Sequence, residues 1–236
     1  MERIDKVISN QTGYSRKEIK ELVRKKRVTV NDEIIVKSDV KVDPNTDRIT
    51  VDGQEITVKK FVYLMLNKPK GYISATEDRS QQTVLDLVPE EHLHRSLFPA
   101  GRLDKDTTGL MLITDDGDFA HNILAPKKHV SKTYNVTIDI PMTEAMIEGF
   151  RNGVELNDGE CKAASLTITD SHTGIVILTE GRYHQIKRMF GCYGAKVTEL
   201  QRIAIGSLQL PADLELGQCR EFTAEELLAI RQSVKF

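Results

Sequence analysis

A short polar loop holds the first residues that could do chemistry. Residues 101–109 (GRLDKDTTG) are bounded by glycine at both ends and lead directly into the apolar run 110–114. Asp104 and Asp106 therefore lie in a loop that a buried strand would hold in place, and such loops often carry catalytic groups. An ionised Asp104 could act as a nucleophile or as a base. The alternative is that both are turn residues, the commoner use of aspartate in a loop.

A second polar segment, residues 180–190 (EGRYHQIKRMF), combines three cations, an imidazole and an amide at a predicted junction between a strand and a helix. If the chain becomes helical near His184, then Lys187 and Arg188 lie one turn further on neighbouring faces, where a cation can meet the carboxylate of the earlier loop. A neighbouring cation favours the ionised form of a carboxylate. A solvated basic helix start is the alternative interpretation.

A third segment, Lys132-Thr133-Tyr134, opens a predicted strand. The protein contains no tryptophan, so an aromatic platform for an unstacked base must come from tyrosine or phenylalanine. Tyr134 is the candidate for this platform. Its alternative is a half-buried strand tyrosine without a role in binding.

The sequence lacks the usual signatures of metal and cofactor sites. Residues 115–118 (DDGD) do not continue into a calcium-binding loop and are better explained as a turn followed by a helix cap, with Asp118 capping a helix through Leu124. The six histidines have no metal-ligand spacing, so we interpret them as surface or structural groups. The three cysteines are far apart and are interpreted as buried thiols. We expect no metal and no cofactor, because there is also no glycine-rich phosphate loop.

The elements that must position these segments begin at residue 61. Alternating or continuous apolar residues predict the strands 61–67, 110–114, 134–140, 166–169, 175–178 and 197–205. Helices are predicted from Asp118, from Thr143 and over 185–190. The pattern indicates an α+β fold, with a mostly antiparallel sheet in a domain that spans residues 61–236.

The first 58 residues form a separate predicted module. Ser15 and Glu18 have the spacing of a capping box, which predicts a helix over about residues 16–26. A basic stripe follows one side of this helix, and a phosphate backbone would fit it. Its members are Arg16, Lys20, Arg24 and Arg27, and Lys17 of the same helix is a further expected RNA contact. The alternative is a solvated helix face. Short strands at 28–30, 34–36 and 49–51 follow, the last of them ending at the hairpin dipeptide Asp52-Gly53.

Charge supports this division of the 236-residue chain. The net charge is −2, but residues 1–60 carry 14 Lys and Arg against 11 Asp and Glu, so the remainder of the chain is acidic. Nucleic-acid affinity must therefore be local. No apolar stretch has the length of a signal peptide or of a membrane span, so we expect a cytoplasmic protein without membrane contact.

Both modules resemble known families. The first resembles the S-four-type RNA-binding domain, which implies sequence-independent phosphate contacts. Four segments of the second, in the same order and spacing, resemble the RsuA branch of the pseudouridine synthases. These segments are Lys68–Gly71, Gly101–Leu110, Lys132–Tyr134 and Glu180–Met189.

The resemblance implies roles for individual residues. The family isomerises uridine in RNA without a cofactor, so Asp104 would be the essential carboxylate, Tyr134 would stack on the flipped base, and Lys187 would pair with Asp104. Where this chain has Lys187 the family often has arginine, so the bidentate geometry of the pair is lost while its charge is kept. Further RNA contacts are expected at Arg102, Arg182 and Arg188.

The resemblance also implies a target. The expected substrate is small-subunit (16S) ribosomal RNA at U516, bound by a monomer in an assembly intermediate. Residues 66–74 (LNKPKGYIS) and the absence of a long basic tail after Phe236 favour the small-subunit branch over a synthase for large-subunit (23S) RNA. A noncatalytic RNA-binding factor is the other alternative. It would be expected to lack Asp104 or Tyr134, and both are present.

Overall fold

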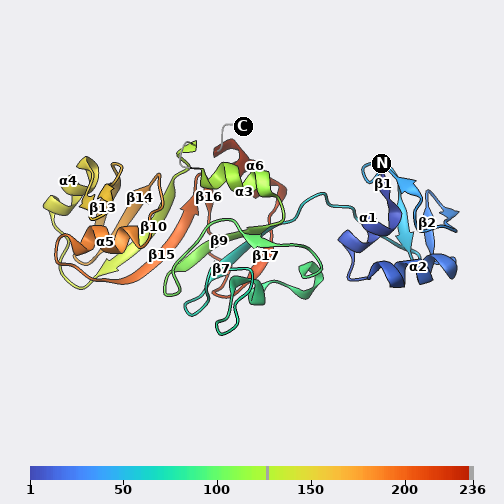
Figure 1. Ribbon diagram of the computed structural model, residues 1–236. Coiled ribbons are helices and arrows are strands. Elements are labelled where there is room, and N and C mark those ends of the chain that lie inside the picture. The colour runs from blue at the N-terminus through green and yellow to red at the C-terminus, as the bar shows by residue number, and fades with distance from the viewer. Residues whose placement is uncertain (126–127, 234–236) are drawn as a thin grey trace. The chain divides into compact units, whose positions relative to one another are not determined.

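The computed structural model describes residues 1–125 and 128–233, which divide into two compact units. Unit 1 comprises Met1–Val62 together with Val88–Leu97, and unit 2 comprises Tyr63–Leu87 and the chain from Phe98 onward. Figure 1 shows both units. The predicted domains are continuous stretches, 1–58 and 61–236, whereas unit 1 also contains Val88–Leu97 from the second stretch.

Unit 1 has two helices and short strands. The elements are β1 (Glu2–Arg3), α1 (Ile4–Gln11), α2 (Arg16–Arg24), β2 (Val28–Val30), β3 (Glu33–Ile34), β4 (Lys41–Val42), β5 (Ile49–Val51), β6 (Gln54–Glu55) and a 3-10 turn at Glu90–His92. The predicted capping box starts α2, since the Ser15 hydroxyl accepts from the Glu18 N–H at 3.3 Å and the Ser15 N–H donates to the Glu18 carboxylate at 2.8 Å. The apolar sides of both helices and β2 and β5 form one core.

Val88–Leu97 contacts the rest of unit 1 through Arg95 and through His94, whose Nε2 lies 3.0 Å from the Asn10 carbonyl oxygen. The Arg95 guanidinium donates to the carbonyl oxygens of Asn10 at 3.2 Å, Lys59 at 3.2 Å and Lys60 at 2.9 Å. Arginine carries five N–H donors and can therefore satisfy several carbonyl groups at once. Local sequence patterns do not indicate such a contact, because its partners are 35 or more residues away.

Unit 2 is built on one twisted sheet with the strand order β13-β14-β10-β15-β9-β7-β17, in which β8 also pairs with β9 and β16 with β15. Its elements are β7 (Tyr63–Lys68), η1 (Val84–Leu87), β8 (Phe98–Pro99), β9 (Thr108–Thr114), α3 (Gly117–Leu124), β10 (Lys132–Ile138), α4 (Glu144–Asn152), β11 (Glu155–Leu156), β12 (Gly159–Glu160), β13 (Ser165–Asp170), β14 (Thr173–Leu178), α5 (Gln185–Gly191), β15 (Val197–Ile205), β16 (Leu208–Gln209), β17 (Cys219–Glu221) and α6 (Ala224–Ser233).

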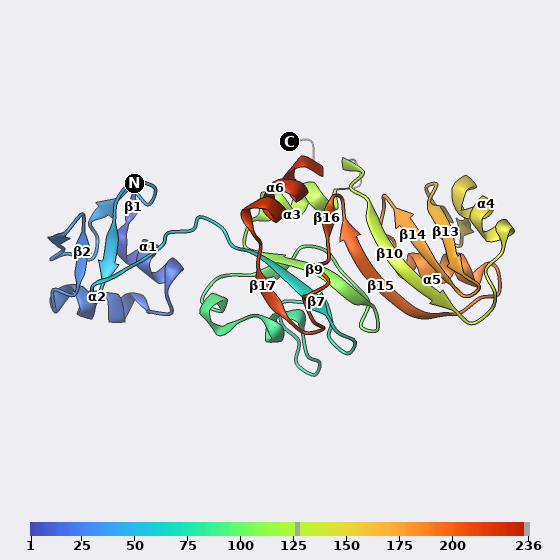
Figure 2. The same cartoon turned by 180° about the vertical axis from the view of Figure 1, so that it is seen from behind.

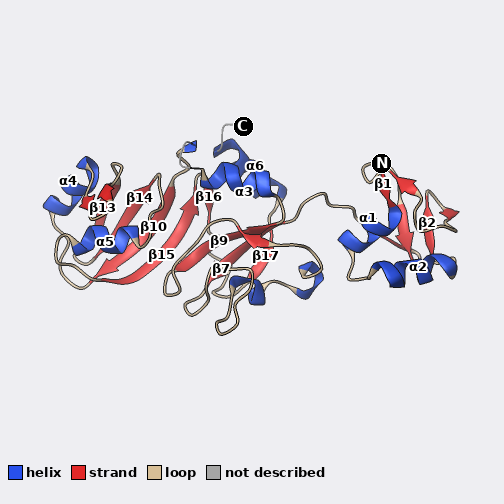
Figure 3. Ribbon diagram, viewed as in Figure 1, coloured by secondary structure: helices blue, strands red, loops and turns tan. Residues whose placement is uncertain are grey.

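The α+β class and the mostly antiparallel sheet are confirmed. Among the paired strands of the described residues, β15 and β9 run parallel and the other pairs are antiparallel. Figures 1 and 2 together place α5 on one face of the β13-β14-β10-β15 half of the sheet. Figure 3 shows how strands dominate unit 2, with α3 and α6 beside β9 and β16. Residues of α3 and α6 share a buried core with β7 and β9.

Two local predictions were wrong, one for the cap of α3 and one for the burial of the cysteines. The cap of α3 is Asp116 rather than Asp118, because the Asp116 carboxylate accepts from the Phe119 N–H at 3.0 Å while its other oxygen accepts from the Tyr63 hydroxyl at 2.6 Å. The cysteines are not all buried, since Cys192 is exposed.

Candidate active site

A buried lysine, Lys68, binds the backbone of the loop that carries Asp104. Lys68 is 0% exposed, and its ammonium donates to the carbonyl oxygens of Thr107 at 2.8 Å, Asp104 at 3.0 Å, Pro69 at 3.1 Å and Lys105 at 3.3 Å. Burial lowers the pKa of Lys68 to about 8. Because three of these carbonyl groups belong to one turn, the lysine fixes the backbone of the turn.

A serine completes the support of the loop. The Ser74 hydroxyl donates to the Leu103 carbonyl at 2.8 Å and accepts from the Leu103 N–H at 2.9 Å. Gly109 ends the loop with a φ of +99°, and a Cβ at this position would lie 2.2 Å from the carbonyl oxygen of Arg202. A glycine is therefore required both by the backbone conformation and by the close approach of β15.

The carboxylate of Asp104 faces two basic side chains. It lies 3.3 Å from the Lys187 ammonium and 3.5 Å from the His184 Nε2 atom. Lys187 makes a shorter contact, 2.6 Å, with Asp106. Burial lowers the pKa of Lys187, but the Asp106 and Asp104 carboxylates outweigh burial and raise it, while the bond from Lys187 lowers the pKa of Asp106. Lys187 is thus a charged bridge between two carboxylates of one loop.

His184 was interpreted from the sequence as a surface or structural group, but it lies at the site. It precedes the first residue of α5 and has a left-handed backbone with φ 49°. Such a conformation is unfavourable for a residue with a side chain and tends to occur at functional sites. The ring stacks on Tyr183 with centroids 3.8 Å apart, and Tyr183 is 76% exposed. The position of His184 within the second polar segment was the available signal.

These residues border a pocket of about 520 Å³. Tyr134 lies in its wall on β10 and is only 9% exposed, so it borders the pocket while little of it meets bulk solvent. The pocket brings together predicted site residues from all three polar segments, namely Arg102, Asp104, Tyr134, Arg182 and Lys187. It also contains Lys132 and Arg202, which we did not predict.

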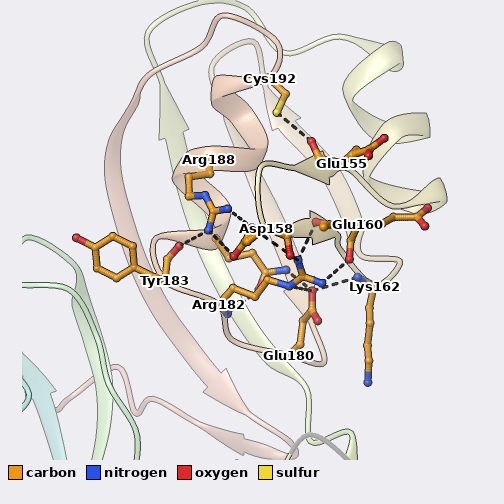
Figure 4. Close-up of polar contacts among 11 residues, drawn as sticks. Glu155, Asp158, Glu160, Lys162, Glu180, Arg182, Tyr183, Arg188 and Cys192 are labelled. Atoms are coloured by element: carbon orange, nitrogen blue, oxygen red, sulfur yellow. Dashed lines mark hydrogen bonds and ion pairs between the residues drawn. The ribbon is translucent and has the colours of Figure 1, made fainter.

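Arg182 and Arg188, expected to contact RNA, are engaged within the protein (Figure 4). The Arg182 guanidinium donates to the Gly159 carbonyl at 2.8 Å and to that of Glu160, and it lies 3.6 Å from the Glu180 carboxylate. Arg188 forms an ion pair with Asp158 and donates to the Tyr183 carbonyl at 3.0 Å.

These contacts tie the β11–β12 hairpin to the segment that carries His184 and Lys187. Glu180 contributes to the same network, since its carboxylate accepts from the Gln185 side chain at 2.7 Å and from the Lys162 N–H at 3.1 Å. The Asp158 contact with Arg188 lowers the pKa of Asp158. Whether Arg182 and Arg188 also contact RNA stays a prediction.

The basic stripe of α2 has a different environment. The side chains of Arg16, Lys17, Lys20 and Arg24 are exposed, and among the described residues they have no hydrogen bond or ion pair. Arg27, the last predicted member of the stripe, forms an ion pair with Asp52. The other three members and Lys17 are therefore available to an external anion.

The described part of the chain contains no cluster of three or more His, Cys, Asp or Glu side chains that could hold a metal ion. It also contains no helix long and apolar enough to cross a membrane.

Comparison with known proteins yields family assignments for both units. Residues 62–191 match the family described as RNA pseudouridylate synthase, and residues 2–47 match the S4 domain. An uncharacterized RNA pseudouridine synthase of Bacillus subtilis is 41% identical over 230 residues, covering 95% of this chain and 96% of the relative. The ribosomal small subunit pseudouridine synthase A of Escherichia coli is 41% identical over 231 residues, covering 97% and 99%.

A solved structure agrees with these relatives. The crystal structure of a pseudouridylate synthase matches with a TM-score of 0.69 at 36% identity, covering 98% of this chain and 100% of that chain.

Proposed function

This chain belongs to the RNA pseudouridylate synthase family, and we propose that it converts one uridine of small-subunit (16S) ribosomal RNA, U516, to pseudouridine. The observation that carries the proposal is the pocket in which Asp104 faces Lys187 and His184 beside Tyr134. The ribosomal substrate is the one named for the relatives in Escherichia coli and Yersinia pestis, which are 41% and 40% identical to this chain.

Asp104 is the group that starts the reaction. Its ionised carboxylate either attacks the anomeric carbon of the ribose or removes a proton from the sugar, and in both cases the uracil departs with the bonding electron pair. The uracil turns and its fifth carbon bonds to the anomeric carbon, while the bond from that sugar carbon to Asp104 breaks or the removed sugar proton is returned. The fifth carbon then loses its proton, and the ring nitrogen gains one. Atoms balance because substrate and product are isomers.

Tyr134 and Lys187 assist Asp104. Tyr134 stacks on the uracil and passes a proton at the sugar or the base, since its hydroxyl can donate and accept. Lys187 holds the Asp104 carboxylate in place and favours its ionised form. Lys187 also forms an ion pair with Asp106, which fixes its position although it lacks the bidentate guanidinium of an arginine.

The target nucleotide must leave the RNA stack to reach this pocket. Extrusion costs a few kcal/mol, which phosphate contacts can offset. The exposed cations of α2, together with Arg102 at the pocket, supply such contacts. We propose that the protein acts as a cytoplasmic monomer on a small-subunit assembly intermediate.

The deciding experiment maps pseudouridine at base resolution in ribosomal RNA transcripts and partial ribosomal particles treated with the wild type, Asp104→Asn or Lys187→Ala. We expect one modified small-subunit uridine, a loss of rate of about 1000-fold or more in Asp104→Asn and a smaller loss in Lys187→Ala, with unchanged RNA affinity. Modification of large-subunit RNA would instead select the other branch of the family. RNA binding without isomerisation in any particle would contradict the enzymatic proposal.

A further inference from the structure

Two buried cations in the pocket have no anionic partner in the described part of the chain. Lys132 is 9% exposed, and its ammonium donates to the carbonyl oxygen of Val130 at 3.2 Å. Arg202 is 3% exposed, and its Nε donates to the carbonyl oxygen of Leu110 at 2.7 Å, while its buried Nη2 has no hydrogen-bond partner among the described residues. Within residues 1–125 and 128–233, neither side chain forms an ion pair with a carboxylate.

This arrangement is energetically unfavourable without a ligand. Buried charges are normally paired, because removal from water costs several kcal/mol per ion after relaxation. Here the two charges also repel each other, since burial and, after it, the charge of Arg202 lower the pKa of Lys132. Lys68 is also buried, but its ammonium donates to four carbonyl oxygens. Lys132 and Arg202 lack such a shell.

The fold places both cations around the base platform. Lys132 and Tyr134 are two residues apart on β10, so their side chains project from the same face of the sheet. Tyr134 is the register partner of Arg202 on the neighbouring strand β15. All three line the pocket that Asp104 borders. A base stacked on Tyr134 would therefore have cations close to its edge.

We propose that Lys132 and Arg202 form an anion site for the uracil ring itself and stabilise the negative charge that develops when the glycosidic bond breaks. This inference rests on the proposed function. As the bond between the anomeric carbon and the ring nitrogen breaks, its electron pair stays on the uracil, where the charge spreads onto the carbonyl oxygens. Preorganised cations directed at those oxygens bind the charged ring more tightly than the neutral base.

The charge is transient, which explains why the pocket holds cations without a permanent counterion. The ring becomes neutral again once its fifth carbon has bonded to the sugar and the proton from that carbon has been replaced by one on the nitrogen. A carboxylate paired permanently with Arg202 would cancel the field that the departing uracil experiences.

Binding of barbituric acid to the full-length protein tests this site independently of catalysis. Barbituric acid has the size of uracil and is an anion near neutral pH, so calorimetry can compare it with neutral uracil. We expect the wild type to prefer barbiturate. Lys132→Met and Arg202→Met should each weaken barbiturate binding by about 10- to 100-fold and change uracil binding much less. Lys196→Met, which removes an exposed lysine of the same unit, is the matched control.

Two further measurements keep the inference testable. If circular dichroism shows that Arg202→Met does not fold, Arg202→Lys should retain most of the preference for barbiturate, because it retains the charge. Barbiturate binding that is unchanged in Lys132→Met and in a folded Arg202 variant overturns the proposal. Inorganic phosphate binding as tightly as barbiturate in the wild type also overturns it, in favour of an RNA phosphate site. Failure of the proposed function would appear instead in the pseudouridine map.

Discussion

The cations that surround the Asp104 loop and those of α2 differ in what surrounds them. Lys68 is fully buried among four carbonyl oxygens, and Lys187 lies between two carboxylates. Arg16 and Lys20 are exposed on α2, with no hydrogen bond or ion pair among the described residues. A buried charge acts strongly because little water screens it, whereas water and salt weaken an exposed one. One substitution among the cations that surround the Asp104 loop should therefore outweigh several on α2.

Lys68→Met should lower stability and activity more than any substitution on α2. A smaller loss than for the α2 variants would contradict the difference between buried and exposed cations. The substitution leaves buried carbonyl groups of the Asp104 turn without a donor, at about 1–3 kcal/mol for each unsatisfied group. We expect the free energy of unfolding to fall by about 3 kcal/mol and activity to be lost, as measured by urea unfolding with circular dichroism and by pseudouridine formation. Lys105→Met, an exposed lysine in the same loop, should change stability by less than about 0.5 kcal/mol.

The stability and activity of the protein should also depend on pH through the buried Lys68. The pKa of Lys68 falls from 10.5 to about 8 in the folded protein, so between these values the unfolded chain binds more protons. The contribution of Lys68 to the unfolding free energy therefore rises with pH over this range. Activity should decline about tenfold as pH passes 8, because a neutral amine has fewer N–H donors for the loop.

A pH–rate profile from pH 6 to 10 measures this decline. In an active Lys68→Arg variant the decline should be absent, since a guanidinium stays charged. The same decline in both proteins would show that another group causes it.

Arg188 has features of both groups of cations, because its sequence context suggests an RNA contact while its observed partner is Asp158. If Arg188 acts by holding the hairpin against the His184 segment, Asp158→Ala should lower activity about as much as Arg188→Ala, on the order of tenfold. The salt dependence of RNA binding would then be the same in both variants and the wild type. A smaller salt slope in Arg188→Ala alone would indicate a phosphate contact instead.

The α2 cations should give the smallest effect per residue. Lys20→Ala with Arg24→Ala should weaken ribosomal RNA binding a few-fold and reduce the slope of log affinity against log salt by about 1 to 2, as measured by filter binding. Lys37→Ala with Lys41→Ala removes the same charge from exposed positions elsewhere in unit 1. Equal slopes for the two double variants would contradict a specific role for the stripe.

Local patterns were sufficient to predict much of the fold. The strand 197–205 and the helix start at Ser15 follow from alternation and from capping chemistry, which act within a few residues. The capping residue of α3 was predicted wrongly because Asp116 and Asp118 both suit a cap. The choice depends on Tyr63, 53 residues away, whose hydroxyl donates to Asp116.

The candidate site was predicted less completely for the same reason. Asp104, Tyr134 and Lys187 each lie in a short polar segment, and the family resemblance of these segments implied their roles, which stay predictions. Lys68 and Arg202 lie within apolar strands, where the sequence alone cannot distinguish an ordinary charged residue at a strand end from one buried against a distant loop. Both side chains donate to backbone carbonyl oxygens. Because every residue has a carbonyl group, the sequence does not show which of them a lysine or arginine will contact.

The parallel pairing of β15 with β9 has a consequence for the order of events during synthesis. It joins Gln201 to Thr108 and Arg202 to Gly109, residues more than 90 positions apart. Contacts between such distant residues form late, since the intervening chain must first be made and its ends brought together. A nascent chain that carries the Asp104 loop but not β15 therefore has no complete pocket. The Asp104 carboxylate, for which we propose a catalytic role, therefore has a complete pocket only after nearly nine-tenths of the protein has left the ribosome, the machine whose RNA it is proposed to modify.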